Sequence, residues 1–173
     1  MICSACGYAN IEGADVCERC EQSLTHLSKP RPKSNLERSI WKDHLSLLSP
    51  RSPFTVTPET KTGEVLKLLV DRSIGCVVVV KGEQVVGIFS ERDALMRLNT
   101  EYAQCAQRPV SEFMTPTVES LQLDDKIAFA LHKMDLGGYR HLPILEDGQL
   151  RGVISVRDIL RYMTTTILTA ELG

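Results

Sequence analysis

The heptapeptide "GIFSERD" at residues 87–93 returns later in the chain as "GVISVRD" at residues 152–158. Each copy reads glycine, two apolar residues, serine, a variable residue, arginine and aspartate. Each also follows an apolar run typical of a strand and precedes a helical pattern. A phrase that recurs in the same context predicts an internal repeat, with a serine and an aspartate at equivalent points of the two copies.

The flanking residues predict the same order of elements twice: a short extended segment, a helix, two strands and a closing helix. In the first copy the strands are joined at residues 81–83. In the second copy we expect strands at 141–145 and 150–154, joined through residues 147–148. Two such copies are expected to pack on each other and cover each other's sheet.

The spacing between the copies is expected to change along the chain. The opening segments align Val56 with Val118, whereas the strands align Gly87 with Gly152, which is a larger offset. We therefore expect extra residues in the second copy before its strands, near residues 137–138.

The composition is that of a globular chain of 173 residues with 43% hydrophobic residues and a formal net charge of −2. This charge gives no broad positive field for nucleic acid or anionic membranes. No apolar run approaches the roughly 20 residues of a membrane span, and the N-terminus lacks the apolar segment of a secretory signal. We expect a cytoplasmic protein that has no membrane partner.

Four of the six cysteines form two Cys-x-x-Cys pairs within the first twenty residues: Cys3, Cys6, Cys17 and Cys20. Each pair presents two thiolates to one tetrahedral ion, with zinc favoured over iron. The segment is too short to bury a core, so the metal would supply about 10 to 16 kcal/mol of folding energy. Two disulfides are the alternative, which a reducing compartment opposes. Four sulfur ligands close the coordination shell, which favours a structural ion.

By resemblance, "CSACGYANIEGADVCERC" is similar to the short zinc ribbons at the start of many bacterial regulatory proteins. Through residue 24 this segment carries four acidic residues and one basic residue, a charge of −3, which would repel a phosphate backbone. We therefore expect it to dock to a protein or to the other domain. The run "KPRPK" at 29–33 predicts an extended linker, and "NLERSIWKDHLSLL" at 35–48 predicts a helix leading into the main domain.

The repeat resembles a tandem pair of CBS domains, a Bateman module, over about residues 51–166. Its markers are "GIFSERD", "GVISVRD" and "YRHLPIL". The resemblance implies an α/β fold, a pseudo-twofold pair of β-α-β-β-α units with clefts that bind adenosine compounds such as AMP, ADP, ATP, dinucleotides or S-adenosylmethionine. The expected divisions are a zinc ribbon at 1–24, a linker and lead-in helix at 25–50, CBS domains at 51–106 and 107–166, and a C-terminal tail at 167–173.

The repeated serine and aspartate have two interpretations. Ser90 and Ser155 are positioned as helix N-caps, with Asp93 and Asp158 at the third helical position. The same groups suit a nucleotide, because a carboxylate accepts both hydroxyls of a ribose diol while the serine and the helix amides meet a phosphate. Their recurrence in a repeat resembling this family favours ligand contact.

The resemblance assigns further ligand contacts. The opening segments would line the adenine pocket, and Arg140 and His141 match positions that often face phosphate, although His141 could equally be a core histidine. The full set of expected ligand residues is Thr55, Val56, Ser90, Arg92, Asp93, Thr117, Val118, Arg140, His141, Ser155, Arg157 and Asp158.

The two clefts are not expected to be equal. The positions aligned with Arg140 and His141 are Gly75 and Cys76, which offer no charge to a phosphate. We expect one dominant nucleotide site in each chain, with Arg140 favouring phosphorylated ligands over adenosine.

Three functions from different classes remain open. The first is a non-enzymatic regulator that senses an adenine nucleotide, AMP, ADP or ATP, carries structural zinc, forms a homodimer and signals to a partner. The second is a dimerising scaffold without a ligand. The third is a nucleic-acid-binding regulator that uses the ribbon. An enzyme is not expected, because none of the four histidines has a recognisable nucleophile partner and Cys76 lies in an apolar strand.

Overall fold

The computed structural model describes residues 2–3, 5–11, 14–24, 34–116 and 118–171. The chain separates into two compact units, Met1–Asn35 and Leu36–Gly173. The first has a small core around Cys3, Cys17 and Leu24, and the second has two larger hydrophobic cores. The basic run at 29–33 lies outside the described residues.

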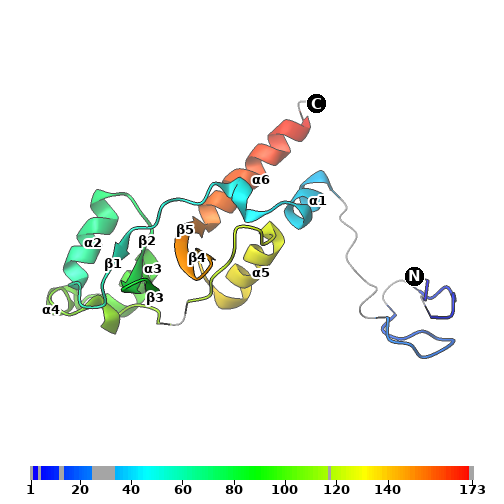
Figure 1. The fold of residues 1–173 in the computed structure, drawn as a ribbon, viewed down its shortest axis with the longest axis horizontal. Coiled ribbons are helices and arrows are strands. Elements are labelled where there is room, and N and C mark those ends of the chain that lie inside the picture. Colours follow the sequence, from blue (N-terminus) through cyan, green and yellow to red (C-terminus); the bar gives the residue numbers. More distant parts are fainter. Residues whose placement is uncertain (1, 4, 12–13, 25–33, 117, 172–173) are drawn as a thin grey trace. The chain divides into compact units, whose positions relative to one another are not determined.

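The first copy of the repeat forms a three-stranded sheet in the order β1-β2-β3 (Figure 1). Strand β1 runs parallel to β2, and β2 runs antiparallel to β3. The β-branched run "VVVV" favours the central strand, which is buried along most of its length. The elements are β1 (Thr55–Val56), α2 (Thr62–Asp71), β2 (Cys76–Lys81), β3 (Gln84–Ser90), α3 (Glu91–Asp93), the π-helical turn η2 (Ala94–Leu98) and α4 (Tyr102–Cys105).

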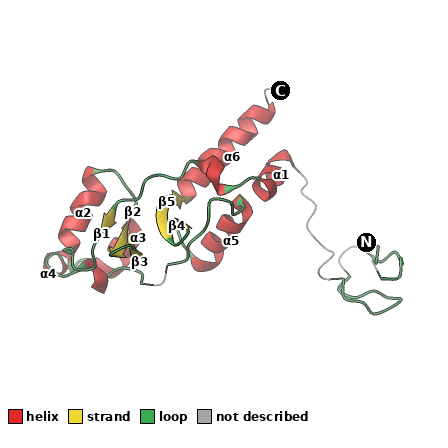
Figure 2. Cartoon of the chain, in the orientation of Figure 1, coloured by secondary structure: helices red, strands yellow, loops and turns green. Residues whose placement is uncertain are grey.

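The second copy repeats this plan, with the antiparallel pair β4-β5 in place of the β2-β3 pair (Figure 2). The strands expected at 141–145 and 150–154 are confirmed to within one residue. Their two-residue turn, Asp147-Gly148, has positive φ at both positions, which is the geometry of a tight hairpin. The elements are η3 (Val110–Glu112), α5 (Ile127–Gly137), β4 (His141–Glu146), β5 (Gln149–Ser155) and α6 (Val156–Glu171).

From Val56 to the second heptapeptide the offset between the copies is constant, and the expected change in spacing is wrong. Val56 pairs with Val79 in the first copy, and Leu121 pairs with Ile144 in the second, also in parallel. Leu121 lies as far after Val56, and Ile144 as far after Val79, as the second heptapeptide lies after the first. The start of helix α5 follows the start of α2 by the same offset. The counterpart of Val56 is therefore Leu121, and no residues are inserted near 137–138.

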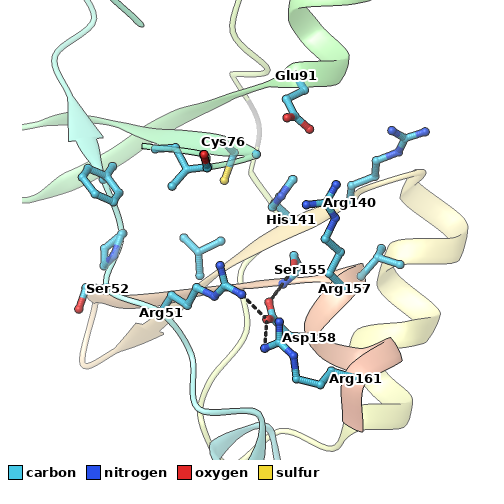
Figure 3. A pocket seen from close by; sticks show the side chains of 17 residues that line it. Arg51, Ser52, Cys76, Glu91, Arg140, His141, Ser155, Arg157, Asp158 and Arg161 are labelled. Carbon is cyan, nitrogen blue, oxygen red and sulfur yellow. Dashed lines mark hydrogen bonds and ion pairs between the residues drawn. The ribbon is translucent and has the colours of Figure 1, made fainter. Parts of the chain in front are cut away.

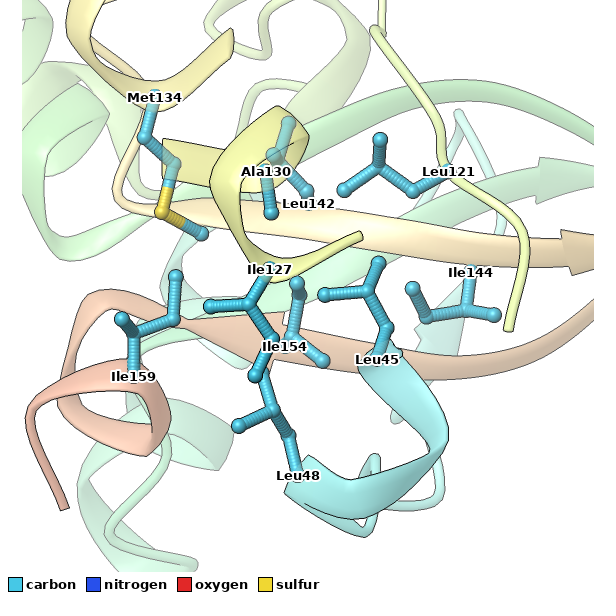
Figure 4. Packing of buried hydrophobic residues seen from close by; sticks show 10 residues of the cluster. All are labelled: Leu45, Leu48, Leu121, Ile127, Ala130, Met134, Leu142, Ile144, Ile154 and Ile159. Carbon is cyan, nitrogen blue, oxygen red and sulfur yellow. The ribbon is translucent and has the colours of Figure 1, made fainter. Parts of the chain in front are cut away.

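Each copy is completed by the chain segment that precedes the other copy. Leu45 and Leu48, from the turn η1 (Leu45–Leu48), are buried in the core of the second copy (Figure 4). Val110 and Phe113 occupy the corresponding places in the core of the first copy. Leu45 and Leu48, expected in the linker, therefore stabilise the second copy, and Val110 and Phe113, expected in the second CBS domain, stabilise the first, because burial removes their apolar surface from water.

The lead-in helix is shorter than expected. Helix α1 (Asn35–Lys42) ends before Asp43, whose carbonyl accepts a 3.0 Å hydrogen bond from the amide of Ile127. The next residue, His44, forms an antiparallel bridge with Lys126. This pairing with the second copy interrupts the predicted helix at 35–48, and the turn η1 follows.

At the other end of the chain, α6 continues through residues 167–171, where the sequence predicts a tail. The last turns of this helix project beyond the sheet of their own unit (Figure 1). Among the residues that the structure describes, no helix has the length and apolar character needed to cross a membrane.

Candidate functional site

Both repeated heptapeptides end at a helix start where serine and aspartate bond to each other. The amide and hydroxyl of Ser90 donate to Oδ2 of Asp93 at 2.9 and 2.6 Å, and the Asp93 amide faces the Ser90 hydroxyl at 3.4 Å. The amide and hydroxyl of Ser155 likewise donate to Oδ2 of Asp158 at 2.8 and 2.6 Å. For Ser90 and Asp93 the capping interpretation is confirmed by a reciprocal box. Each cap uses only one carboxylate oxygen, so Oδ1 remains for other partners.

In the first copy, a side chain from the neighbouring segment satisfies Oδ1. The Thr115 hydroxyl donates a 2.9 Å hydrogen bond to Oδ1 of Asp93, and Nε of Arg97 lies 3.6 Å from the same oxygen. Thr115 is held in place by two backbone hydrogen bonds with Ile88 on β3, of 2.8 and 3.0 Å. Both oxygens of the Asp93 carboxylate therefore accept a hydrogen bond from within the protein.

In the second copy, Oδ1 has cations nearby but no hydrogen bond. The guanidinium groups of Arg51 and Arg161 lie 3.6 and 3.5 Å from Oδ1 of Asp158, which are ion-pair distances. The Asp158 side chain is only 8% exposed. Within the described part of the chain, no donor hydrogen-bonds to this oxygen. This oxygen therefore keeps the capacity to accept a hydrogen bond, which a ligand hydroxyl could donate.

A cavity of about 530 Å³ opens beside Asp158, between the two copies (Figure 3). The size is within the usual range for small-molecule sites. In Figure 3, Ser155 and Asp158 lie at one side of this cavity, and Cys76 and Glu91 of the first copy lie at the other. The cavity is lined by Arg51, Ser52, Pro53, Phe54, Ser73, Ile74, Gly75, Cys76, Glu91, Arg140, His141, Val153, Ser155, Val156, Arg157, Asp158 and Arg161.

A smaller cavity of about 330 Å³ lies beside Asp93. It is lined by Ile88, Ser90, Arg92, Asp93, Met96, Arg97, Thr115, Gly137, Gly138, Tyr139, Arg140 and His141. Its lining largely repeats that of the larger cavity at the constant offset between the copies. We refer to the larger as the Asp158 cavity and to the smaller as the Asp93 cavity.

Each of the two cavities is lined by residues from both copies. Each combines the serine and aspartate of one copy with the start of the first hairpin strand of the other copy. Gly75 and Cys76 line only the Asp158 cavity, whereas Arg140 and His141 line both. The arginine expected to bind phosphate therefore stands at a wall that the two cavities share.

His141 is held in a close contact at this shared wall. A Cβ atom on Gly75 would lie 2.6 Å from Nε2 of His141, so only glycine leaves room for the ring. Nδ1 of His141 is buried and has no hydrogen-bond partner among the described residues. Burial lowers the pKa of His141, although the carboxylates of Glu91 and Asp158 oppose that shift. The imidazole is therefore neutral at neutral pH.

Cys76 is a buried thiol on the opposite wall. Burial, followed by the negative charges of Asp93 and Glu91, raises its pKa to about 12. The thiolate is the nucleophilic form of cysteine, and this environment disfavours it. Cys76 therefore acts as a small apolar wall residue.

The structure separates the expected ligand residues into groups. Ser155, Arg157 and Asp158 line the Asp158 cavity, while Ser90, Arg92 and Asp93 line the Asp93 cavity. Arg140 and His141 line both. Two members of the set, Thr55 and Val56, line neither cavity, and the same is true of Val118. Thr117 lies outside the described residues.

Several cavity residues were missed from the sequence. Phe54, rather than Thr55 or Val56, provides the apolar wall of the Asp158 cavity. Arg51 and Thr115 reach the two aspartates because their backbones pair with Val153 and Ile88, on the strand of the other copy. Val153 and Ile88 occupy equivalent positions of the two copies, so the repeat shows that they correspond. No sequence motif shows that the segments containing Arg51 and Thr115 pair with them.

The second candidate site is the cysteine cluster in the unit Met1–Asn35. The Sγ atoms of Cys3, Cys6, Cys17 and Cys20 all lie within 4.8 Å of one another. The Cys3–Cys20 and Cys6–Cys17 pairs are 3.7 and 3.6 Å apart. A zinc tetrahedron with bonds of about 2.3 Å has edges of about 3.8 Å, which is close to these two distances.

The two halves of the cluster have the same local structure. The amides of Gly7 and Glu21 donate 2.9 Å hydrogen bonds to the carbonyls of Cys3 and Cys17. Gly7 and Glu21 both have positive φ, which closes each turn tightly. Asn10 is also placed beside the cluster, with its amide nitrogen 3.5 Å from Sγ of Cys17. These turns orient all four sulfurs toward one centre.

Comparison with known proteins identifies the repeat. Residues 47–100 and 110–165 match the CBS domain family. An uncharacterized 17.7 kDa protein of Acidianus ambivalens is 31% identical over 69% of this chain and 72% of its own length. The CBS domain-containing protein CBSCBSPB5 of Arabidopsis thaliana is 33% identical over 76% of this chain, but the match spans only 24% of that longer protein.

Solved structures share the fold. The CBS-domain containing protein ATU1752 from Agrobacterium tumefaciens has a TM-score of 0.66 and 32% identity, covering 69% of this chain and 98% of that one. The CBS domain pair of protein MJ0100, in complex with 5′-methylthioadenosine and S-adenosyl-L-methionine, has a TM-score of 0.62 at 19% identity, over 71% and 97% of the chains. CBSX2 in complex with AMP has a TM-score of 0.57 at 22% identity, over 67% and 92%.

The expected α/β pair is thus confirmed by the repeated elements, by the two family matches and by the solved structures of similar fold. The chain belongs to the CBS-domain family and carries two CBS domains in tandem.

Proposed function

We propose that this protein is a non-enzymatic regulator whose Asp158 cavity binds an adenine nucleotide, AMP, ADP or ATP, and signals its presence to a partner protein. The observation that carries the proposal is the Asp158 carboxylate, which is 8% exposed and has one oxygen without a hydrogen bond from the described residues, in a cavity of about 530 Å³. Adenosine compounds bound to the fold relatives MJ0100 and CBSX2 support this ligand class.

The groups around the cavity match the parts of a nucleotide. Oδ1 of Asp158 is available to the hydroxyls of a ribose diol, since a carboxylate accepts two such bonds. Phe54, Ile74 and Val153 offer apolar surface to a base, and Arg140 and Arg157 offer charged donors to phosphate. The ligand would contact both copies at once, so binding would favour one packing of the copies over another.

A thermal-shift screen with adenosine, AMP, ADP, ATP and S-adenosylmethionine tests the proposal. A ligand present at 100 times its dissociation constant adds about 2.7 kcal/mol of stability to the folded state. We expect a clear rise in melting temperature with at least one phosphorylated adenosine compound and none with the matched guanosine or cytidine compounds. A flat response to the whole panel contradicts the proposal.

The two alternative functions give different results. A scaffold without a ligand would leave the screen flat while light scattering showed a stable dimer. A nucleic-acid-binding regulator would bind DNA or RNA with an affinity that falls steeply with salt. The charge of −3 through residue 24 would repel a phosphate backbone, so a protein is the favoured partner of the ribbon and nucleic acid is the less favoured one.

We infer that the cysteine cluster is a structural zinc ribbon. The support is the fit of the four sulfurs to one tetrahedron. When bound, the ion supplies folding energy to a unit whose buried core is only Cys3, Cys17 and Leu24 among the described residues. The closed set of four sulfur ligands assigns no reaction to the metal.

We also infer that two chains associate. Helix α6 exposes three large apolar side chains, Leu160, Ile167 and Leu168, and α5 exposes Phe129 and Leu136. Apolar surface of this kind is covered in many self-associating proteins. Light scattering over a range of concentrations tests the inference, and a 19.3 kDa particle at every concentration contradicts it.

A further inference from the structure

The lining of the Asp158 cavity contains more cationic side chains than carboxylates. Its lining contains four arginines, Arg51, Arg140, Arg157 and Arg161, and two carboxylates, Glu91 and Asp158. Arg51 and Arg161 are both engaged by Asp158, at 3.6 and 3.5 Å. His141, buried and neutral, adds no charge. The lining therefore has a formal excess of two positive charges.

Two of these arginines are uncommitted. In the described part of the chain, neither Arg140 nor Arg157 forms an ion pair or donates a side-chain hydrogen bond, and Glu91 has no cation within ion-pair distance. Figure 3 shows the side chains of Arg140 and Arg157 beside His141, on the same side of the cavity. Both arginines line this cavity, and each planar guanidinium can bind an anionic group of its own.

The Asp93 cavity provides a comparison within the same chain. Arg92, the counterpart of Arg157, donates a 2.7 Å hydrogen bond to the carbonyl of Gly138. Arg97 is bound to the carbonyl of Phe113 at 3.1 Å and to the hydroxyl of Thr115 at 3.2 Å. The arginines that belong to the smaller cavity alone are thus used by the protein itself. Of the two described cavities, only the Asp158 cavity keeps an arginine of its own, Arg157, free in addition to the shared Arg140.

We infer that the Asp158 cavity selects nucleotides with two or more phosphates, ADP or ATP, over AMP and adenosine, and rejects cationic S-adenosylmethionine. This inference rests on the proposed function and narrows its ligand class. Each guanidinium binds a phosphate through paired N–H donors, so a second phosphate gives the second free arginine a partner. A sulfonium group, in contrast, is repelled by a lining with excess positive charge.

Titration calorimetry on the full chain, in buffer without divalent cations, tests the selection. The ligands are adenosine, AMP, ADP, ATP and S-adenosylmethionine. We expect ADP to bind about tenfold more tightly than AMP, the gain typical of one charge-assisted contact. We expect S-adenosylmethionine to bind at least tenfold more weakly than AMP. Equal affinities for AMP, ADP and S-adenosylmethionine would overturn the inference and leave the proposed function intact.

Variants assign the effect to the free arginines. Arg157→Gln and Arg140→Gln should each reduce the ADP preference over AMP to threefold or less. Arg151→Gln removes the same charge from the exposed face of β5, outside both cavities, where Arg151 pairs with Glu146, and should keep the full preference. An equal loss in all three variants would reduce the selection to overall charge and overturn the assignment.

Inorganic pyrophosphate separates the two failures. Its binding, followed by NMR of the full chain, depends on Arg140 and Arg157 but not on recognition of adenosine. If no adenosine compound binds and pyrophosphate binds in an Arg157-dependent way, the proposed function fails and the phosphate site stands. If pyrophosphate also fails to bind, the selection is refuted as well.

Discussion

The Thr115 hydroxyl lies 2.9 Å from Oδ1 of Asp93 and donates a hydrogen bond to it. The equivalent oxygen of Asp158 is faced by the guanidinium groups of Arg51 and Arg161 and receives no hydrogen bond from the described residues. In both copies of the Ser-x-Arg-Asp phrase the serine donates two hydrogen bonds to the aspartate, but the copies differ in which groups face the second carboxylate oxygen. In one copy the carboxylate is part of the structure, and in the other it is available to a ligand.

Replacing Thr115 by valine should destabilise the protein by about 1 to 2 kcal/mol. The change keeps the side-chain shape and removes the hydroxyl that satisfies Asp93. Urea unfolding measures the loss as a lower midpoint at unchanged slope. Thr55→Val, on the exposed edge of β1, is the control and should stay within about 0.5 kcal/mol of the parent. Equal effects of the two variants would show that the hydrogen bond contributes little.

The glycine that begins each repeated heptapeptide is required by close packing, but to different degrees. A Cβ atom on Gly152 would lie 2.7 Å from Cβ of Pro50 and 3.3 Å from the Arg51 carbonyl. At Gly87 the clash is with the side chain of Met114, which is flexible. We expect Gly152→Ala to cost about 2 to 3 kcal/mol and Gly87→Ala clearly less. Thermal unfolding of both variants measures the difference, and the opposite order would contradict this packing.

The stability of the protein should depend on pH through His141. Burial lowers the pKa of this side chain below its ordinary value of about 6.5. The unfolded chain then binds a proton at a pH where the folded chain does not. The contribution of His141 to the free energy of unfolding is fully present above a pH of about 6.5. It is lost as the pH falls below that value, until the folded protein also binds the proton.

Chemical denaturation of the parent and of His141→Gln at pH 7.5 and 5.5 measures this contribution. The parent should lose more stability than the variant on acidification. The same substitution at His132, which is exposed on α5, is the control and should leave the loss unchanged. An identical loss in the parent and His141→Gln would exclude His141 as the source.

Metal analysis of the purified protein should find about one zinc ion in each chain. Cys17→Ser removes one of the four ligands and should abolish stoichiometric zinc, whereas Cys76→Ser, outside the cluster, should retain it. A chelator should unfold residues 1–24 and leave the melting of the unit Leu36–Gly173 unchanged. Residues 1–24 that stay folded without metal, or iron in place of zinc, would contradict the assignment.

The elements of the repeat could be predicted because their patterns are local. The valine run of β2 and the hairpin turn at Asp147-Gly148 each lie within a short stretch of chain, as do the paired cysteines of the N-terminal unit. The lead-in helix could not be predicted in full, because the hydrogen bond between the Asp43 carbonyl and the Ile127 amide ends it. That contact joins residues far apart in the sequence and has no local pattern.

The candidate site was predicted in part for the same reason. Ser155 and Asp158 belong to one repeated phrase, so the sequence shows them. Arg51 reaches Asp158 only through the exchange of segments between the copies, and the alignment of Val56 with Val118 hid that exchange. The distinction between the two aspartates depends on Thr115, which lies outside the repeated phrase.

The central claim is that the Asp158 carboxylate binds the nucleotide and the Asp93 carboxylate does not. Titration calorimetry with ADP on Asp158→Ala and Asp93→Ala tests it most directly, because both variants lose the same bonds from their serine partners. We predict that Asp158→Ala weakens ADP binding at least tenfold, whereas Asp93→Ala changes it by less than about threefold. An equal loss of affinity in the two variants, or a larger loss in Asp93→Ala, would contradict the account.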